Sequence, residues 1–179
     1  SEMCIRDSAC SNFGNIFFIR QKETKGLGHG VLCAKSFVGN EPFAVLYGDD
    51  VIISDTPVTK QLCDAYDKYS KGCVGVKPVP KKDITKYCTL AVEKLEGNCF
   101  NCTDMIEKPE PEEIMSNYSI LGRVVLPPEI FDILENTPLG AGNELQLTDA
   151  MKTLAQTPVS YTHLRAHETL SNLVSRLLL

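Results

Sequence analysis

The fold of this chain is decided by residues 18–50, which read FIRQKETKGLGHGVLCAKSFVGNEPFAVLYGDD. A glycine-rich turn at residues 26–30 leads toward an apolar run of strand length, which ends in Gly48-Asp49-Asp50. Glycine lets a flat ligand lie against the backbone, and a carboxylate at the end of a strand can hold a hard cation. The two features together, about twenty residues apart in the chain, predict a nucleotide site.

The first half of the chain alternates between strand and helix patterns. The expected elements are a strand at 15–19, a helix at 30–38, a strand at 42–47, a helix at 56–70 and a strand at 73–79. We expect Thr56 to cap the second helix, Pro57 to take its first position and Gly72 to close it. This alternation favours a parallel sheet with helices on its faces.

The second half is richer in strands. Strands are expected at 87–94, 99–107 and 119–126, and helices at 128–134 and 147–155. The turn Glu96-Gly97-Asn98 joins the first two strands as a hairpin. The whole pattern predicts an α/β fold with a Rossmann-like, mixed but mainly parallel sheet flanked by helices.

Composition narrows the class of protein. The chain has 179 residues, a net charge of -5 and 43% hydrophobic residues, which suits one domain with a real core. The negative charge argues against a nucleic-acid partner. No apolar run suggests a membrane span, and no secretion signal is visible. We therefore expect a cytoplasmic protein whose eight cysteines are reduced thiols, Cys99 and Cys102 included.

Longer motifs carry a family resemblance. They are Phe18-Ile-Arg-Gln-Lys-Glu23, Lys25-Gly-Leu-Gly-His29, Val31-Leu-Cys-Ala34, Val38-Gly-Asn-Glu-Pro42, Glu107-Lys-Pro109, Ser116-Asn117, Ile120-Leu-Gly-Arg123, Pro128-Glu-Ile-Phe-Asp-Ile-Leu134 and Gly140-Ala-Gly142 with Glu144-Leu-Gln-Leu-Thr-Asp-Ala150. In this order, over residues 15–156, the chain resembles the bacterial UTP–glucose-1-phosphate uridylyltransferases. Gly28 and His29 favour this branch over relatives that use dTTP, which usually carry Gly-Leu-Ala-Gln at this turn.

The resemblance implies a nucleotide-diphospho-sugar transferase fold and a reaction. Glucose 1-phosphate and UTP give UDP-glucose and pyrophosphate, with Mg²⁺ as cofactor and in-line attack on the α-phosphorus. The nucleophile is already an anion, so catalysis rests on positioning and charge neutralisation. Full-length family members are expected to be homo-oligomers.

The resemblance also assigns roles to individual residues. It implies that Asp49 is the metal ligand and that Asp49 and Lys108 are the catalytic residues. The implied nucleotide-binding residues are Gln21, Gly26 and Gly28. The implied sugar-phosphate-binding residues are Glu107, Lys108, Asn117 and Glu144. Each residue has an ordinary alternative role. Asp49 could cap a turn, Gln21 and Gly26 could form a plain loop before a helix, and Glu107 with Lys108 could be an exposed ion pair.

The ends of the chain depart from the family. Residues 1–8 and 158–179 resemble translated sequencing-adapter read-through, so we expect both segments to be non-native and residues 9–157 to form a partial nucleotidyltransferase domain. An amphipathic helix with Leu170, Leu173, Val174 and Leu177 on one face is the rival for the tail.

Two further departures concern the site. The family's Gly-x-Gly-Thr-Arg phosphate loop and its C-terminal segment do not occur, so we expect a fold that is incomplete at both ends and a chain that is inactive by itself. Cys88 stands where the family usually has a glycine against the sugar.

Three other functions stay open. The chain could belong to another sugar nucleotidyltransferase, using dTTP or a different base or sugar. It could be a non-catalytic binding protein on the same fold, which would be expected to lose Asp49 or Lys108. It could also be an interaction module built on the leucine-rich tail.

Overall fold

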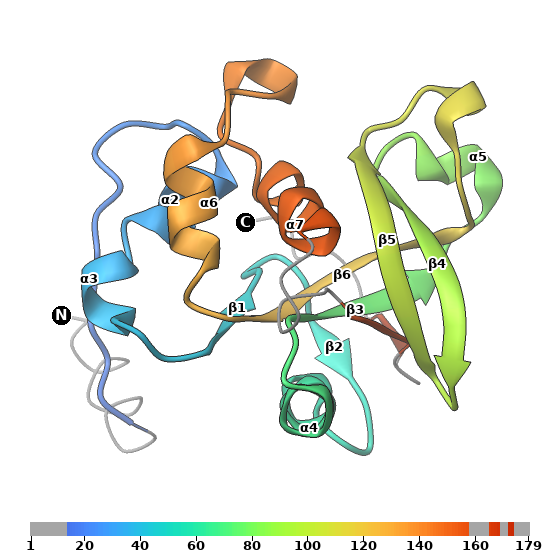
Figure 1. Cartoon of the computed structure of the whole chain (residues 1–179), viewed down its shortest axis with the longest axis horizontal. Helices are drawn as coiled ribbons and strands as arrows, with labels where there is room; N and C mark the ends of the chain where they lie inside the picture. Colours follow the sequence, from blue (N-terminus) through green and yellow to red (C-terminus); the bar gives the residue numbers. More distant parts are fainter. Residues whose placement is uncertain (1–13, 158–164, 169–171, 174–179) are drawn as a thin grey trace, which may run out of the picture.

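A six-stranded sheet organises the computed structural model, which describes residues 14–157, 165–168 and 172–173 (Figure 1). In spatial order its strands are β1 (Phe43–Leu46), β6 (Tyr118–Leu126), β3 (Cys73–Pro78), β7 (Arg165–Glu168), β5 (Cys99–Glu107) and β4 (Cys88–Glu96). A separate pair joins β2 (Ile52–Ile53) to β8 (Asn172–Leu173). The α/β class with a mixed sheet is therefore confirmed.

The pairing of the strands differs from the expectation of a mainly parallel sheet. Among the described pairs of this sheet only β3 with β7 is parallel, and the other neighbours run antiparallel. The reason is the place of β6, which lies between β1 and β3 and runs antiparallel to both. β1 and β3 thus point the same way, as the alternation predicts, but they are not neighbours.

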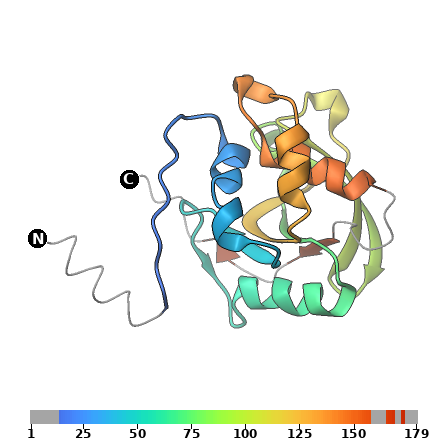
Figure 2. The same ribbon diagram turned by 60° about the vertical axis from the view of Figure 1, so that its left-hand side comes forward.

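Helices cover both faces of this sheet. They are α2 (Leu27–Leu32), α3 (Lys35–Val38), α4 (Val58–Tyr69), α5 (Lys81–Ile84), α6 (Ile130–Asn136) and α7 (Leu147–Gln156), with 3₁₀ turns at Pro111–Glu113 and Ala141–Asn143. Figures 1 and 2 show α4 on one face and α2, α6 and α7 together on the other. None of the helices within the described residues has the length and apolar character needed to cross a membrane.

Helix α4 follows from its apolar spacing, but its ends differ from the expected ones. Val58, Leu62 and Ala65 are buried against β3 and β6, as a helical repeat of three and four residues requires. The helix begins one residue after Pro57, so Pro57 rather than Thr56 is the capping residue. It ends at Tyr69, and the next residue, Ser70, adopts φ 50° and takes the left-handed conformation expected of Gly72.

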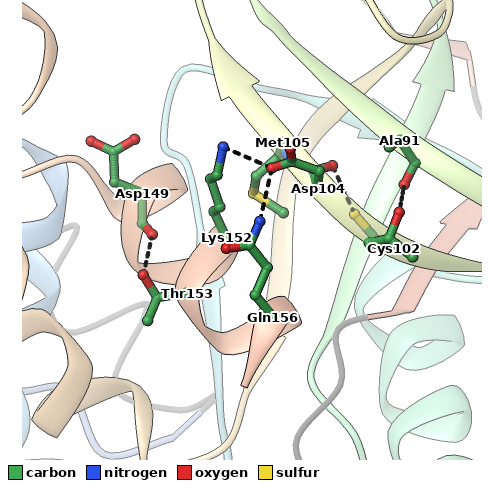
Figure 3. Close-up of polar contacts among 9 residues, drawn as sticks. Ala91, Cys102, Asp104, Met105, Asp149, Lys152, Thr153 and Gln156 are labelled. Carbon is green, nitrogen blue, oxygen red and sulfur yellow. Dashed lines mark hydrogen bonds and ion pairs between the residues drawn. The ribbon is translucent and has the colours of Figure 1, made fainter. Parts of the chain in front are cut away.

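The second half supplies most of the larger core. The hairpin of β4 and β5 forms in the expected place, with Cys88 opposite Glu107 at its open end. Helix α7 lies on β5, where Lys152 Nζ is 2.9 Å from Asp104 Oδ1 and Gln156 Nε2 donates to the same oxygen at 3.4 Å (Figure 3). These contacts fix the second half of α7 relative to β5.

One expected strand does not form, and the described part of the tail differs from the rival expectation of an amphipathic helix. Residues 15–19, although described, are neither helix nor strand. In the tail, residues 165–168 and 172–173 are strands, so Leu173 lies in β8 rather than in an amphipathic helix. Leu170, Val174 and Leu177, the other residues of that expected helix, lie outside the described residues.

Candidate functional site

A cavity of about 400 Å³ opens where several strands of the sheet end. Its wall is built from the loop after β1, the ends of β3 and β5, the start of β4, the first half of β6 and the first turn of α7. Ligands of open α/β sheets bind at such an edge, because the loops that follow the strands converge there. The volume of this cavity is within the range of small-molecule binding sites.

The cavity brings together carboxylates and ammonium groups from distant parts of the chain. Asp49, Asp50 and Glu107 supply the carboxylates, and Lys77, Lys86 and Lys108 supply the ammonium groups. Carboxylate oxygens suit hard divalent cations, and lysine ammonium groups suit phosphate oxygens. The wall thus carries the groups needed for a phosphorylated ligand with a metal ion.

The two aspartates after β1 are placed differently. Asp49 is exposed, whereas Asp50 is half-buried and its side chain lies against the Cα of Gly122 in β6. Of the two aspartates, Asp49 is therefore the one that is exposed at the cavity. The described part of the chain holds no group of three His, Cys, Asp or Glu side chains that could enclose a metal. This donor set fits Mg²⁺, which commonly uses one or two carboxylates together with water and substrate phosphates.

Glu107 and Lys108 form the opposite wall, at the end of β5. The hydroxyl of Thr148, in the first turn of α7, donates to Glu107 Oε2 at 3.0 Å. Lys108 adopts φ 48°, a left-handed conformation that costs a non-glycine residue about 1 kcal/mol or more. Its N–H donates to the carbonyl of Tyr87 at 2.7 Å, which holds this bend in place. This energetically unfavourable backbone conformation therefore turns Lys108 out of the strand at the cavity.

Two groups in the wall are held neutral by burial. Burial and the neighbouring Cys88, Glu107, Asp50 and Asp49 raise the pKa of the Tyr47 phenol far above its ordinary value. Burial also raises the pKa of the Cys88 thiol to about 11, against opposing hydrogen bonds from Ile120 and Ser119. Cys88 lines the cavity beside Glu107, so it presents an uncharged thiol to the cavity.

The glycine-rich turn lies beside this cavity rather than in its wall. Of residues 26–28, Leu27 lines the cavity as the described residues form it, but Gly26 and Gly28 do not. A Cβ on Gly26 would lie 2.7 Å from Glu144 Cβ, and one on Gly28 would lie 2.7 Å from Leu145 O. The backbone of the turn also forms a hydrogen bond to residues 144–145, because the Gly28 N–H donates to Leu145 O at 2.9 Å. Close packing against residues 144–145 therefore explains these glycines in the absence of any ligand.

The other predicted residues surround the site. Gln21 Nε2 donates to the carbonyl of Gly26 at 3.1 Å and lies 2.9 Å from His29 Nδ1, so Gln21 braces the turn. Asn117 and Glu144 are exposed and lie outside the cavity wall that the described residues form. Glu144 is nevertheless linked to it, because its carboxylate lies 3.5 Å from Nε2 of Gln146, a residue of the wall.

Sequence reasoning gave no role to several residues that the structure places here. Lys77 is a charged residue at the end of the otherwise buried β3, and this contrast could have marked it as a residue of the site. Lys86 offers no such contrast, because it is exposed and paired with Asp83 at 2.8 Å. Arg123 was recognised only as part of a motif, although it bonds to the loop that carries Asp49.

Comparisons with known proteins support the same interpretation. The chain is 48% identical over 142 residues to UTP–glucose-1-phosphate uridylyltransferase YngB of Bacillus subtilis, a match that covers 79% of this chain and 48% of that protein. Its structure is similar to a UDP-glucose pyrophosphorylase complexed with UDP-glucose, with a TM-score of 0.83, 36% identity and coverage of 94% of this chain and 66% of that one.

A second solved structure, UTP-bound UGPase from Acinetobacter baumannii, has a TM-score of 0.77 and 28% identity, covering 97% of this chain and 62% of that chain. The chain spans about half the length of the curated relatives it matches. The expected resemblance to UTP–glucose-1-phosphate uridylyltransferases is confirmed by these similarities. Residues 5–167 match the family described as nucleotidyl transferase, which is most of the chain. This chain belongs to the nucleotidyl transferase family.

Proposed function

We propose that this chain is part of a UTP–glucose-1-phosphate uridylyltransferase and forms its sugar-phosphate site with one metal carboxylate. The observation that carries the proposal is the common cavity of Asp49, Glu107 and Lys108, which come from the ends of two strands far apart in the sequence. Relatives whose names describe this activity match the chain over 79% of its length. The activity is proposed for the whole protein, because the chain spans about half of these relatives.

The reaction requires little covalent chemistry from the protein. A phosphate oxygen of glucose 1-phosphate forms a bond to the α-phosphorus of UTP, and the bond from that phosphorus to the β-phosphate oxygen breaks to release pyrophosphate. Since the attacking oxygen is an anion, no general base is needed. The residues must instead orient the two substrates and offset their negative charge.

The cavity offers a division of roles. Lys108 supplies an ammonium group to the sugar phosphate, and its bent backbone turns it out from the end of β5. The Glu107 carboxylate, oriented by Thr148, accepts hydrogen bonds from sugar hydroxyls. Asp49 holds Mg²⁺, which when bound neutralises phosphate charge. Asn117 and Glu144 complete the sugar side from outside the cavity wall.

The nucleotide side is proposed for the neighbouring turn. Gln21 and Gly26 bind the uracil, Gln21 through a side-chain amide that offers both a donor and an acceptor and Gly26 through its main chain. Gly28 keeps the turn close to Leu145 and so sets the position of both residues. We also propose that the whole protein is cytoplasmic and homo-oligomeric, as expected from the family resemblance.

The test is the Lys108→Ala variant of the whole protein that carries this segment. Loss of the positive charge at the sugar phosphate should lower kcat/KM for UDP-glucose formation about 100-fold or more. Lys82→Ala is the matched control, because Lys82 is an exposed lysine of α5 outside the cavity wall. Near-normal turnover of Lys108→Ala would refute the proposal. Faster turnover with dTTP than with UTP would favour a thymidylyl enzyme instead.

A further inference from the structure

Arg123 makes an unusual set of contacts beside the cavity. From β6 its guanidinium donates to three main-chain carbonyls, those of Tyr47 at 3.0 Å, Asp50 at 2.6 Å and Gly122 at 2.7 Å. Two of these carbonyls belong to the residues at the two ends of the loop that contains Asp49. A guanidinium has its donors in a rigid planar fork, so one side chain can fix several carbonyls at once.

The neighbouring glycine holds the same loop from the other side. Gly122 adopts φ 52°, and its carbonyl accepts the N–H of Tyr47 at 2.9 Å. A Cβ at this position would lie 2.1 Å from Asp50 Oδ2 and 3.2 Å from Asp50 Cβ, so a larger residue would displace the Asp50 side chain. The Asp50 N–H also donates to the Tyr47 carbonyl at 3.3 Å, which closes the loop as a tight turn.

These contacts leave Asp49 at the apex of a braced loop. Asp50 is turned inward against β6, whereas Asp49 is exposed at the cavity. Gly122 lines the cavity that the described residues form, but Arg123 does not. Arg123 therefore acts through the loop rather than on a ligand.

We propose that Arg123 is a positioning residue that holds Asp49 in the orientation needed to bind the metal ion. The proposal rests on the proposed function, in which Asp49 is the metal carboxylate. A single exposed carboxylate has several rotatable bonds, and fixing its backbone in advance reduces the entropy lost when a cation binds. Without the guanidinium, the loop samples other conformations and the metal site is weakened although Asp49 is still present.

The experiment measures Mn²⁺ binding by electron paramagnetic resonance in the whole protein that carries this segment. Arg123→Gln removes the charge-assisted bonds and should weaken Mn²⁺ binding about ten-fold, while Arg123→Lys keeps one strong donor and should lose less. Arg20→Gln is the control, because Arg20 is an exposed arginine distant in sequence from the loop. Hydrogen exchange should rise in the Arg123→Gln variant at residues 47–50.

Two further measurements separate positioning from a general loss of stability. Excess Mg²⁺ should restore turnover of Arg123→Gln but not of Asp49→Asn, because only the former keeps the carboxylate. Gly122→Ala, which disturbs the same loop but keeps the Arg123 side chain, should also weaken Mn²⁺ binding.

The outcomes distinguish the two proposals. If Asp49→Asn weakens Mn²⁺ binding and Arg123→Gln does not, the positioning role is wrong and the metal assignment stands. If Asp49→Asn leaves Mn²⁺ binding unchanged, the metal assignment fails, and the role of Arg123 fails with it. A lower melting temperature of Arg123→Gln with unchanged Mn²⁺ affinity would show a purely structural arginine and would also overturn the proposal.

Discussion

Removing the hydrogen bond from Thr148 to Glu107 measures how much this bond contributes to holding the Glu107 carboxylate in the proposed sugar site. Thr148 is only 7% exposed, and its hydroxyl lies 3.0 Å from Glu107 Oε2. Thr148→Val keeps the shape and the β-branching of the side chain, so the change removes little except the hydroxyl. Hydrogen bonds to charged groups contribute about 1.5–3 kcal/mol. Because Glu107 is half-buried and water can replace part of the bond, we expect a loss of about 1 kcal/mol.

The same loss should appear in the kinetics of the whole protein. Glu107 is proposed to bind sugar hydroxyls in the ground state and in the transition state alike, so a loosened carboxylate raises KM more than it lowers kcat. A loss of about 1 kcal/mol corresponds to an increase of roughly five-fold in KM for glucose 1-phosphate. Steady-state kinetics with varied glucose 1-phosphate measures this value, and urea denaturation measures the stability.

Thr153 provides a matched control on the same helix (Figure 3). Its hydroxyl donates to the carbonyl of Asp149 at 3.1 Å, and the residue is exposed. Thr153→Val should change stability by less than about 0.5 kcal/mol and leave KM unchanged. If Thr148→Val behaves like Thr153→Val in both assays, the proposed support of Glu107 is wrong.

The remaining predictions concern the glycine turn and a buried thiol. Gly28→Ala should lower the free energy of unfolding by about 2 kcal/mol, because its Cβ would lie 2.7 Å from the backbone oxygen of Leu145. Gly30→Ala in the same helix meets its nearest atom at 3.6 Å and should be neutral or stabilising by about 0.5 kcal/mol, so equal urea midpoints for the two variants would contradict the packing argument. At pH 8 iodoacetamide should modify the buried Cys88, whose raised pKa of about 11 leaves roughly one thiolate in a thousand, much more slowly than the exposed Cys63. Mass spectrometry of the peptides measures both rates, and comparable rates would show that Cys88 is accessible.

Local patterns were enough to predict most of the elements. The apolar spacing along α4 and the turn between β4 and β5 set both elements to within a few residues. The end of α4 was missed because Ser70 took the left-handed conformation two residues before Gly72, and the sequence favours glycine there.

The neighbours of each strand could not be read from the same patterns. The alternation of strand and helix patterns predicts that β1 and β3 run in one direction, but it does not show that β6 lies between them. Pairing depends on contacts between residues far apart in the chain, which a local pattern does not contain.

Site residues could be predicted from the sequence where they belong to a motif with a known chemical role. Asp49, Glu107 and Lys108 were selected from the sequence, and the structure places them around one cavity. Arg123 could not be recognised in this way, because the carbonyls that it donates to in the Asp49 loop belong to residues that are more than seventy positions away.

The position of β6 has a consequence for the order in which the protein folds. β1 and β3 are both synthesised well before β6, yet the strand that joins them is β6. During translation the first half of the chain therefore leaves the ribosome with two strands that have no common neighbour until residues 118–126 emerge. Such long-range pairing slows folding and exposes strand edges in the interval. A nascent chain that ends before β6 should remain sensitive to proteolysis, and one that includes it should gain protection in a single step.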